Sequence, residues 1–171
     1  MRKAGLLLLL LLAACAPVAT LMPARPATAP GGAFGLSVFY NKDTGFSAPF
    51  PYLALFWGDG EKEFGVFSQL GAGAYAKFRL AEGFSLRASV GVPGPWYEGA
   101  LLYDAGPLTL SGRFSYGREE WNGRVRYLWL GEASATYWYQ GLGFEAGILF
   151  GEGGWNPVFS VGYWFELPAG K

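Results

Sequence analysis

The sequence predicts an all-β fold: an antiparallel up-and-down β-barrel of about eight strands, with a range of eight to ten. Three observations support this prediction. The 171 residues include 27 glycines, 18% are aromatic and none is histidine, a composition that favours strands and tight turns. From residue 50 onward apolar side chains recur at every second position, which is the period of strands with two different faces. Short turns also alternate with longer connections between these segments, as in barrels built from hairpins.

The N-terminus has the pattern of an export signal. Arg2 and Lys3 precede an unbroken leucine run at 6–12, and small residues follow. The run is far shorter than the roughly 20 residues of a membrane-spanning helix. We therefore expect residues 1–14 to be a signal peptide that is removed.

The only cysteine of the chain, Cys15, follows this signal, so no intrachain disulfide can form. Leu12-Ala13-Ala14-Cys15 resembles the bacterial lipobox, in which the cysteine receives a diacylglyceryl group before cleavage ahead of it. The resemblance implies lipidation of Cys15 by the lipoprotein processing machinery. Ordinary cleavage after Ala16 is the alternative, although Pro17 would then directly follow the cut.

The next part of the chain shows no sustained period. Residues 15–33 are rich in Pro, Ala and Thr, so we expect them to carry the lipidated cysteine and to act as a tether. This leaves residues 34–171 as the barrel domain.

Eight strands are expected within that domain. They lie at approximately 50–57, 64–80, 84–92, 97–104, 107–117, 124–139, 142–150 and 157–167. Tight turns are expected at 81–83, 105–107 and 140–141, and longer connections at 58–63, 92–96, 118–123 and 151–157. A further strand-like segment at 34–41 would make nine strands and leave the termini on opposite sides. It either pairs with a split of a long segment to give ten strands or lies outside the wall.

One face of these strands is apolar, and the other carries Gly and Ser with single charges. A sheet facing water would carry many Lys, Glu, Thr and Asp, whereas small residues fit inside a narrow barrel. The charges on this face number four of each sign, and we expect them to form a buried network, because an unpaired charge there would be costly. The members are Arg79, Arg87, Arg113, Arg126, Glu98, Asp104, Glu132 and Glu145. Solvated surface charge is the alternative interpretation.

The segment 125–139 carries aromatic residues at both ends of its apolar face. Tyr127 and Trp129 stand at one end, Tyr137 and Tyr139 at the other, with small residues between them. This arrangement is typical of the two interfacial girdles of a membrane barrel strand.

The last strand alternates hydrophobic residues and ends in a Tyr-x-Phe pair: Phe159, Val161, Tyr163 and Phe165. It resembles the C-terminal targeting strand of bacterial outer-membrane proteins. The resemblance implies recognition by the barrel assembly machinery and contact with outer-membrane lipids. Six residues follow Phe165, whereas in that family the aromatic residue is terminal or nearly so.

Composition excludes several functions. Without histidine, His-dependent nucleophiles cannot be built, and metal binding has little support without a second cysteine. A net charge of zero offers no basic face for nucleic acid.

We therefore expect a non-enzymatic barrel without a cofactor in the outer membrane of a bacterial cell envelope. Its role would be structural, adhesive or in surface interaction, with a filled interior rather than an open pore. The first alternative is a lipid-anchored soluble lipocalin-like or β-sandwich domain that binds an apolar ligand. The second is an envelope enzyme that uses the carboxylates Glu98, Glu132 and Glu145. The sequence names no ligand.

Overall fold

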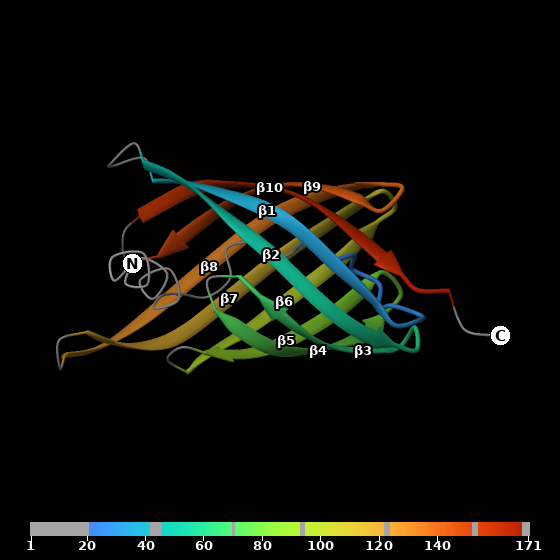
Figure 1. Ribbon diagram of the computed structural model, residues 1–171, viewed down its shortest axis with the longest axis horizontal. Helices are drawn as coiled ribbons and strands as arrows, with labels where there is room; N and C mark the ends of the chain where they lie inside the picture. The colour runs from blue at the N-terminus through green and yellow to red at the C-terminus, as the bar shows by residue number, and fades with distance from the viewer. Residues whose placement is uncertain are drawn as a thin grey trace, which may run out of the picture.

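The computed structural model is a closed barrel of ten antiparallel strands (Figure 1). It describes residues 21–41, 46–69, 71–92, 95–121, 124–151 and 154–168, so the predicted signal peptide and Cys15 lie outside the described residues. The strands are β1 (Gly31–Asn41), β2 (Phe46–Gly58), β3 (Lys62–Ser68), β4 (Ala72–Ala81), β5 (Phe84–Val92), β6 (Trp96–Ala105), β7 (Leu108–Trp121), β8 (Arg124–Tyr139), β9 (Leu142–Gly151) and β10 (Gly154–Glu166). Each strand pairs with its neighbours in the sequence, and β1 closes the barrel on β10. The predicted all-β up-and-down barrel is confirmed, with ten strands.

The two strands beyond eight come from the alternatives that the sequence left open. The segment at 34–41 belongs to the wall, in a strand that begins earlier at Gly31 and pairs with both β2 and β10. The single strand expected at 64–80 is a hairpin of β3 and β4, paired from Ser68 with Ala72 onward. Even-numbered positions are the more exposed ones on both sides of this turn. The alternation therefore continues through it, which is why periodicity alone did not detect the reversal.

The connections are more even in length than predicted. β7 and β8 pair as far as Trp121 and Arg124, and β10 already begins at Gly154. Many of the residues expected in the long connections 118–123 and 151–157 therefore belong to paired strands. The split of 64–80 adds one reversal, which moves the connection at 59–61 to the same end as the turns at 82–83, 106–107 and 140–141. We call this the turn end, on the right in Figure 1, and the other the loop end.

Local chemistry fixes the turns at the turn end. Gln140 and Gly141 both have positive φ, 49° and 85°, as two-residue hairpin turns prefer. In the turn at 59–61, the Asp59 carboxylate accepts N–H bonds from Glu61 and Lys62 at 2.9 and 2.8 Å. These bonds lower the pKa of the exposed Asp59 side chain.

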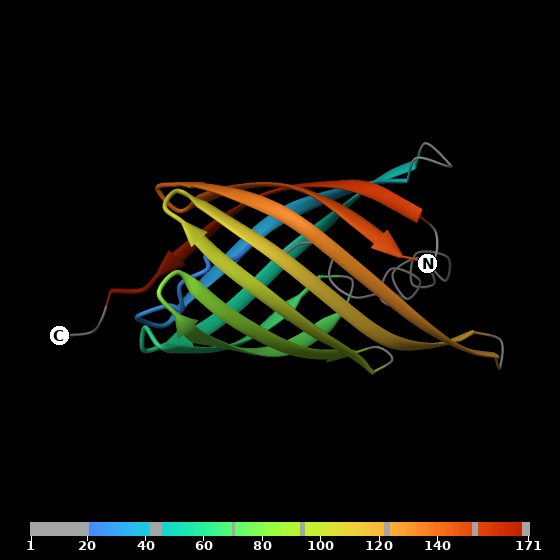
Figure 2. The same ribbon diagram turned by 180° about the vertical axis from the view of Figure 1, so that it is seen from behind.

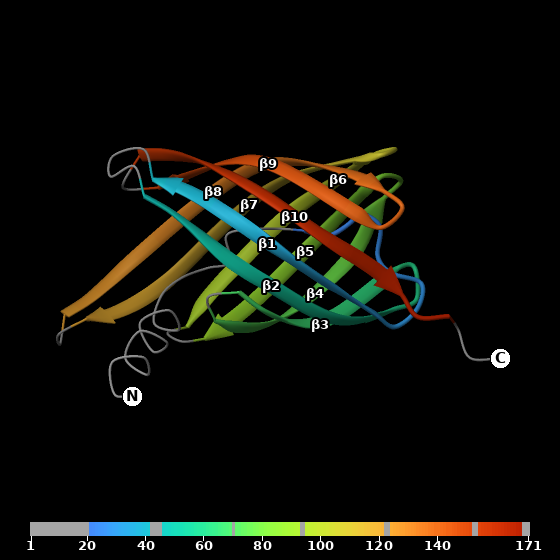
Figure 3. The same ribbon diagram turned by 45° about the horizontal axis from the view of Figure 1, so that its top comes forward.

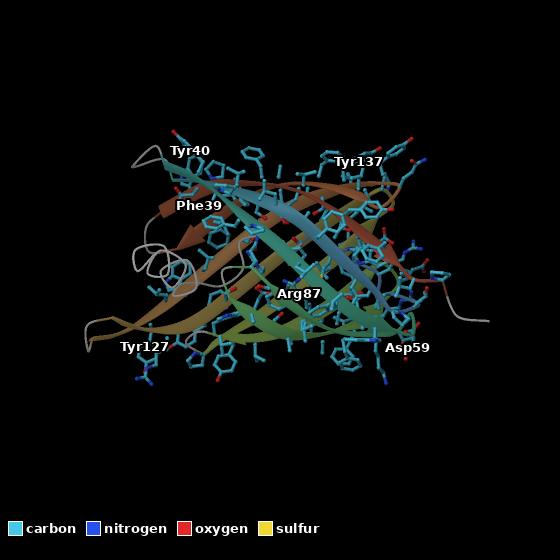
Figure 4. All side chains as sticks on the ribbon, viewed as in Figure 1. Phe39, Tyr40, Asp59, Arg87, Tyr127 and Tyr137 are labelled. Carbon is cyan, nitrogen blue, oxygen red and sulfur yellow. The ribbon has the colours of Figure 1, made fainter. Side chains whose placement is uncertain are left out.

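The strands run obliquely around the barrel (Figures 1 and 2) and alternate side chains between its two faces. The outer face is apolar: the exposed large hydrophobic residues include Phe34, Leu53, Leu55, Val66, Val90, Leu101, Leu110, Phe114, Phe144 and Ile148. Aromatic side chains are exposed near both ends of the wall, with Tyr40 and Tyr127 near the loop end and Tyr137 near the turn end in Figure 4. The inner face carries the charged and hydroxyl side chains, such as the buried Arg87.

Residues 21–30 reach into the turn end of the barrel, with Arg25, Thr28 and Pro30 exposed, and we call them the inner segment. It joins the start of β1 at the turn end, where Leu167 donates its N–H to the Pro30 carbonyl (2.7 Å). Figure 3 shows this part of the chain in blue at the same end. Leu21, Met22, Ala24 and Ala27 are almost fully buried. Of the stretch expected to be a tether, the structure thus places 21–30 in the inner segment, packed against the wall, and 31–33 in β1, while 15–20 lie outside the described residues.

Glycine makes room for the inner segment at one point of the wall. A Cβ added to Gly35 would lie 2.8 Å from Leu21 Cδ1, and one added to Gly162 would lie 3.0 Å from it. The two glycines are Cα partners across β1 and β10. A side chain at either position would therefore clash with the backbone of the facing strand and with Leu21.

Candidate functional site: the barrel interior

A network of four charged side chains crosses the inner face of four adjacent strands, and we call it the wall network. Arg87 of β5 pairs with Glu98 of β6, and Arg113 of β7 pairs with both Glu98 (3.2 Å) and Glu132 of β8. The side chains of all four are at most 5% exposed. Arg113 and Glu132 are direct cross-strand partners, so the register itself brings opposite charges together.

Hydroxyl groups add hydrogen bonds to the wall network and extend it. Ser89 and Ser115 donate to the two oxygens of Glu98 at 3.3 and 3.4 Å. On the next strands, Ser134 donates to Glu145 at 2.8 Å. The buried carboxylates are thus held by arginines and serines of the same wall, as burial of charge requires.

A second polar cluster lies on β3 and β4 and holds the inner segment, and we call it the segment clamp. Its members are Glu63, Tyr75 and Lys77. Lys77 pairs with Glu63 at 2.8 Å, both fully buried, and Tyr75 donates to Glu63 at 2.7 Å.

The inner segment supplies the remaining partners of the clamp. The Ala27 N–H donates to Glu63 Oε2 at 2.7 Å. Lys77 Nζ donates to the carbonyls of Pro23 (3.1 Å) and Arg25 (3.2 Å). The backbone of the inner segment therefore supplies hydrogen-bond partners to the buried pair of Glu63 and Lys77. The pair in turn supplies partners to backbone groups that take part in no strand ladder.

Further contacts fix the inner segment along its length. The Ala24 N–H donates to Thr109 Oγ1 at 3.2 Å, the Arg25 side chain pairs with Asp104, and the Thr28 N–H reaches Glu166 at 3.2 Å. Arg87 of the wall network approaches Met22 Sδ at 3.3 Å. The segment is thus bound by several strands of the barrel at once.

Apolar clusters occupy much of the remaining interior. The larger one joins Leu21 and Met22 of the inner segment to Tyr52, Phe56, Phe67, Tyr75 and Trp96. The smaller one contains Leu149 and Val158, with Phe39, Phe50 and Leu130 packed against them. In Figure 4, Phe39 lies toward the loop end and Arg87 near the middle of the barrel. Side chains and the inner segment therefore occupy much of the described interior.

The structure places the residues predicted for the interior network in three settings. Arg87, Glu98, Arg113, Glu132 and Glu145 are buried inside. Asp104 pairs with the inner segment instead of with a wall arginine. Arg79 is outside the network, because its side chain is 40% exposed and pairs with Glu61 of a turn at 2.8 Å. The side chain of Arg126 lies outside the described residues.

Sequence reasoning missed the segment clamp. Glu63 was assigned to a long connection, whereas β3 begins at Lys62. Glu63 shares its parity with Gly65 and Phe67, so a strand extended to Lys62 would have placed it on the inner face; the hairpin of β3 and β4 then brings it opposite Lys77. The inner segment gave no such signal, because its contacts to the clamp use backbone groups.

The predicted assembly residues lie on β10. Phe159, Val161 and Tyr163 point outward and are exposed, and Phe165 stacks on Tyr163 with ring centroids 6.1 Å apart. β10 closes the barrel by pairing with β1. Whether the assembly machinery recognises these residues stays a prediction.

The described interior holds few features typical of catalysis. In the described ranges, no group of three or more His, Cys, Asp or Glu side chains could hold a metal ion. Glu98 and Glu132, two of the carboxylates considered for an enzyme, are ion-paired with arginines, and Glu145 accepts a serine hydroxyl. These contacts tie the three carboxylates to arginines and serines of the wall.

Comparisons with known proteins give no match to a family model, a curated protein or a solved structure. Within the described parts of the chain, no helix has the length and apolar character needed to cross a membrane.

Proposed function

We propose that this chain is a membrane-embedded β-barrel of a bacterial outer membrane, without enzymatic activity. It would serve as a closed structural or adhesive element at the cell surface, and Cys15 would add a lipid anchor. The proposal joins the export and lipobox patterns of the sequence to the distribution of side chains on the barrel.

The observation that carries the proposal is the inverted distribution of polarity. The wall exposes Phe114 (55%), Phe144 (51%) and many other large apolar side chains, while Lys77 and Glu63 are fully buried within it. A domain in water would expose its charges and bury its apolar residues. An exposed apolar surface of this extent marks contact with a membrane or with a protein partner, and it covers strands all around the barrel.

The same distribution argues against the alternatives. A lipocalin-like domain would need an apolar cavity inside and a polar outer face, which is the opposite arrangement. The single closed barrel also replaces the two packed sheets of a β-sandwich.

The groups that lie inside the barrel favour a closed element over a pore. The inner segment, the two polar clusters and the apolar clusters occupy the lumen. A ten-stranded barrel is close in size to the eight-stranded ones whose interiors side chains fill.

Gel mobility with and without boiling, measured on protein extracted from the membrane fraction, tests the proposal. A closed membrane barrel is expected to stay folded in cold SDS and to migrate differently after boiling. The same protein in planar bilayers should show no steady ion conductance. A chain that is water-soluble without its lipid and shows no mobility shift would contradict membrane embedding, and steady conductance would contradict the closed interior.

A further inference from the structure

At the loop end, β3 stops short of its neighbour β2. β2 pairs with β1 from Phe46 to Phe56 but with β3 only from Leu53 to Gly58. Toward the loop end, residues 46–52 of β2 therefore have no described ladder partner on the β3 side. This exposes a stretch of strand edge within the wall.

Two prolines lie on this edge. The N–H and C=O groups of successive residues in a strand point alternately to the two neighbouring strands. Contacts along β2 show which residues face β3 and which face β1. The Leu55 carbonyl faces Gly65 of β3, whereas the Ala54 carbonyl faces Gly32 of β1. Pro49 and Pro51 share the parity of Leu55, so their ring nitrogens face the gap and offer no N–H donor. A strand from a second chain could not complete a ladder here.

A hollow of about 750 Å³ lies where the β2–β3 ladder ends. Its volume falls within the range of about 300–1,000 Å³ typical of small-molecule sites. It spans β2 to β6 and is lined mainly by outward residues, including Leu53, Val66, Val90 and Val92, with Phe67 and Trp96 among the other lining residues.

Small residues create the depth of this hollow. Ala72 and Ala74 lie at outward positions of β4, between the larger side chains of β3 and β5. A Cβ added to Gly73 would lie 2.6 Å from Phe67 Cζ, so the ring fills the space that a side chain would take. The small side chains of Ala72 and Ala74 thus leave the outer face of β4 recessed between β3 and β5.

We propose that the hollow binds one acyl chain of a phospholipid from the surrounding membrane. The inference rests on the proposed function, because only an embedded barrel would open this hollow to hydrocarbon. Among the described residues that line it there is no Asp, Glu, Lys or Arg, so this lining offers apolar contact without a site for a charged headgroup. The prolines argue against a second copy as the occupant, because β2 cannot add a strand there.

Native mass spectrometry of the full chain, released from dioleoylphosphatidylcholine vesicles that also contain oleic acid, tests the inference. The wild type is expected to retain one phospholipid. Ala74→Trp fills the hollow, and Ala72→Trp fills it independently; each should reduce lipid retention by at least about tenfold. Ala133→Trp, at an exposed outward position of β8, is the matched control and should retain the lipid.

Equal retention by wild type, Ala74→Trp, Ala72→Trp and Ala133→Trp would overturn the inference, as would bound oleic acid or a dimer in place of the bound phospholipid. Heat-dependent gel mobility of the same vesicle samples separates the two proposals. A wild type that inserts but retains no lipid overturns the acyl-chain site alone. A wild type that does not insert overturns both.

Discussion

The wall network and the segment clamp both stabilise buried ion pairs, but with partners from different parts of the chain. Both bury ion pairs inside the barrel, and both begin from cross-strand partners, Arg113 with Glu132 in the first and Glu63 with Lys77 in the second. The wall network is completed by serines of the wall. The clamp is completed by backbone groups of the inner segment. The wall network therefore takes most of its partners from the wall itself, whereas the clamp depends on residues 21–30.

Deleting residues 21–30 should have the largest effect, because it removes every partner that the clamp takes from the inner segment. Several buried hydrogen bonds at about 0.5–1.5 kcal/mol each, together with the charge left poorly solvated, give an expected loss of about 3–5 kcal/mol in the free energy of unfolding. Urea titration of the protein in vesicles measures this loss, and planar bilayers should show conductance that is absent from the full chain. Unchanged stability and no conductance would mean that the segment does not fill the lumen.

Arg113→Met should lower the free energy of unfolding nearly as much, even in the full chain with the inner segment present. The change removes the arginine that bridges Glu98 and Glu132. Breaking a buried pair from one side typically costs about 3–5 kcal/mol. The urea midpoint is the measurement. Adding Glu132→Gln should recover part of the loss, because it removes one of the stranded charges; a double variant less stable than Arg113→Met would contradict the network.

Lys77→Met separates the two clusters, because its effect should depend on the inner segment. In the full chain it breaks the pair with Glu63 and two bonds to backbone carbonyls, with an expected cost of about 2–4 kcal/mol. In the chain lacking 21–30 the cost should fall by at least about 1 kcal/mol, since those two bonds are already lost. The same double-mutant cycle with Arg113→Met should give nearly additive effects. Additivity for Lys77→Met would show that the clamp does not hold the segment.

Arg79→Met should have the smallest effect. Its side chain pairs with Glu61 in an exposed position at the turn end, and such pairs contribute about 0–1 kcal/mol. Urea titration beside Arg113→Met makes it a control for the loss of a positive charge. A loss above about 2 kcal/mol would place Arg79 in the buried network after all.

The sequence predicted the faces of the wall better than its turns. Period-two alternation placed Arg87, Glu98 and Arg113 on the inner side because the strands are regular there. It could not locate the hairpin between Ser68 and Ala72, because the same parity is the more exposed one in both strands. The strand count therefore stayed open between eight and ten.

The inner segment could not be predicted, for a different reason. Its contacts with the clamp come from the N–H of Ala27 and from the carbonyls of Pro23 and Arg25, and backbone groups leave no trace in a residue pattern. The composition of 15–33 indicated only a lack of regular structure. The partner residue Glu63 was the accessible clue, since its parity matches the inner face of β3.

The central claim is that the outer face of this barrel contacts hydrocarbon. Tryptophan fluorescence of the protein in vesicles of phospholipids brominated on their acyl chains tests it directly, because Trp57, Trp129 and Trp155 are exposed on the outside. We expect strong quenching compared with unbrominated lipids and weak quenching by aqueous acrylamide. Equal fluorescence in both lipids, with strong quenching by acrylamide, would contradict the claim and show that these rings face water.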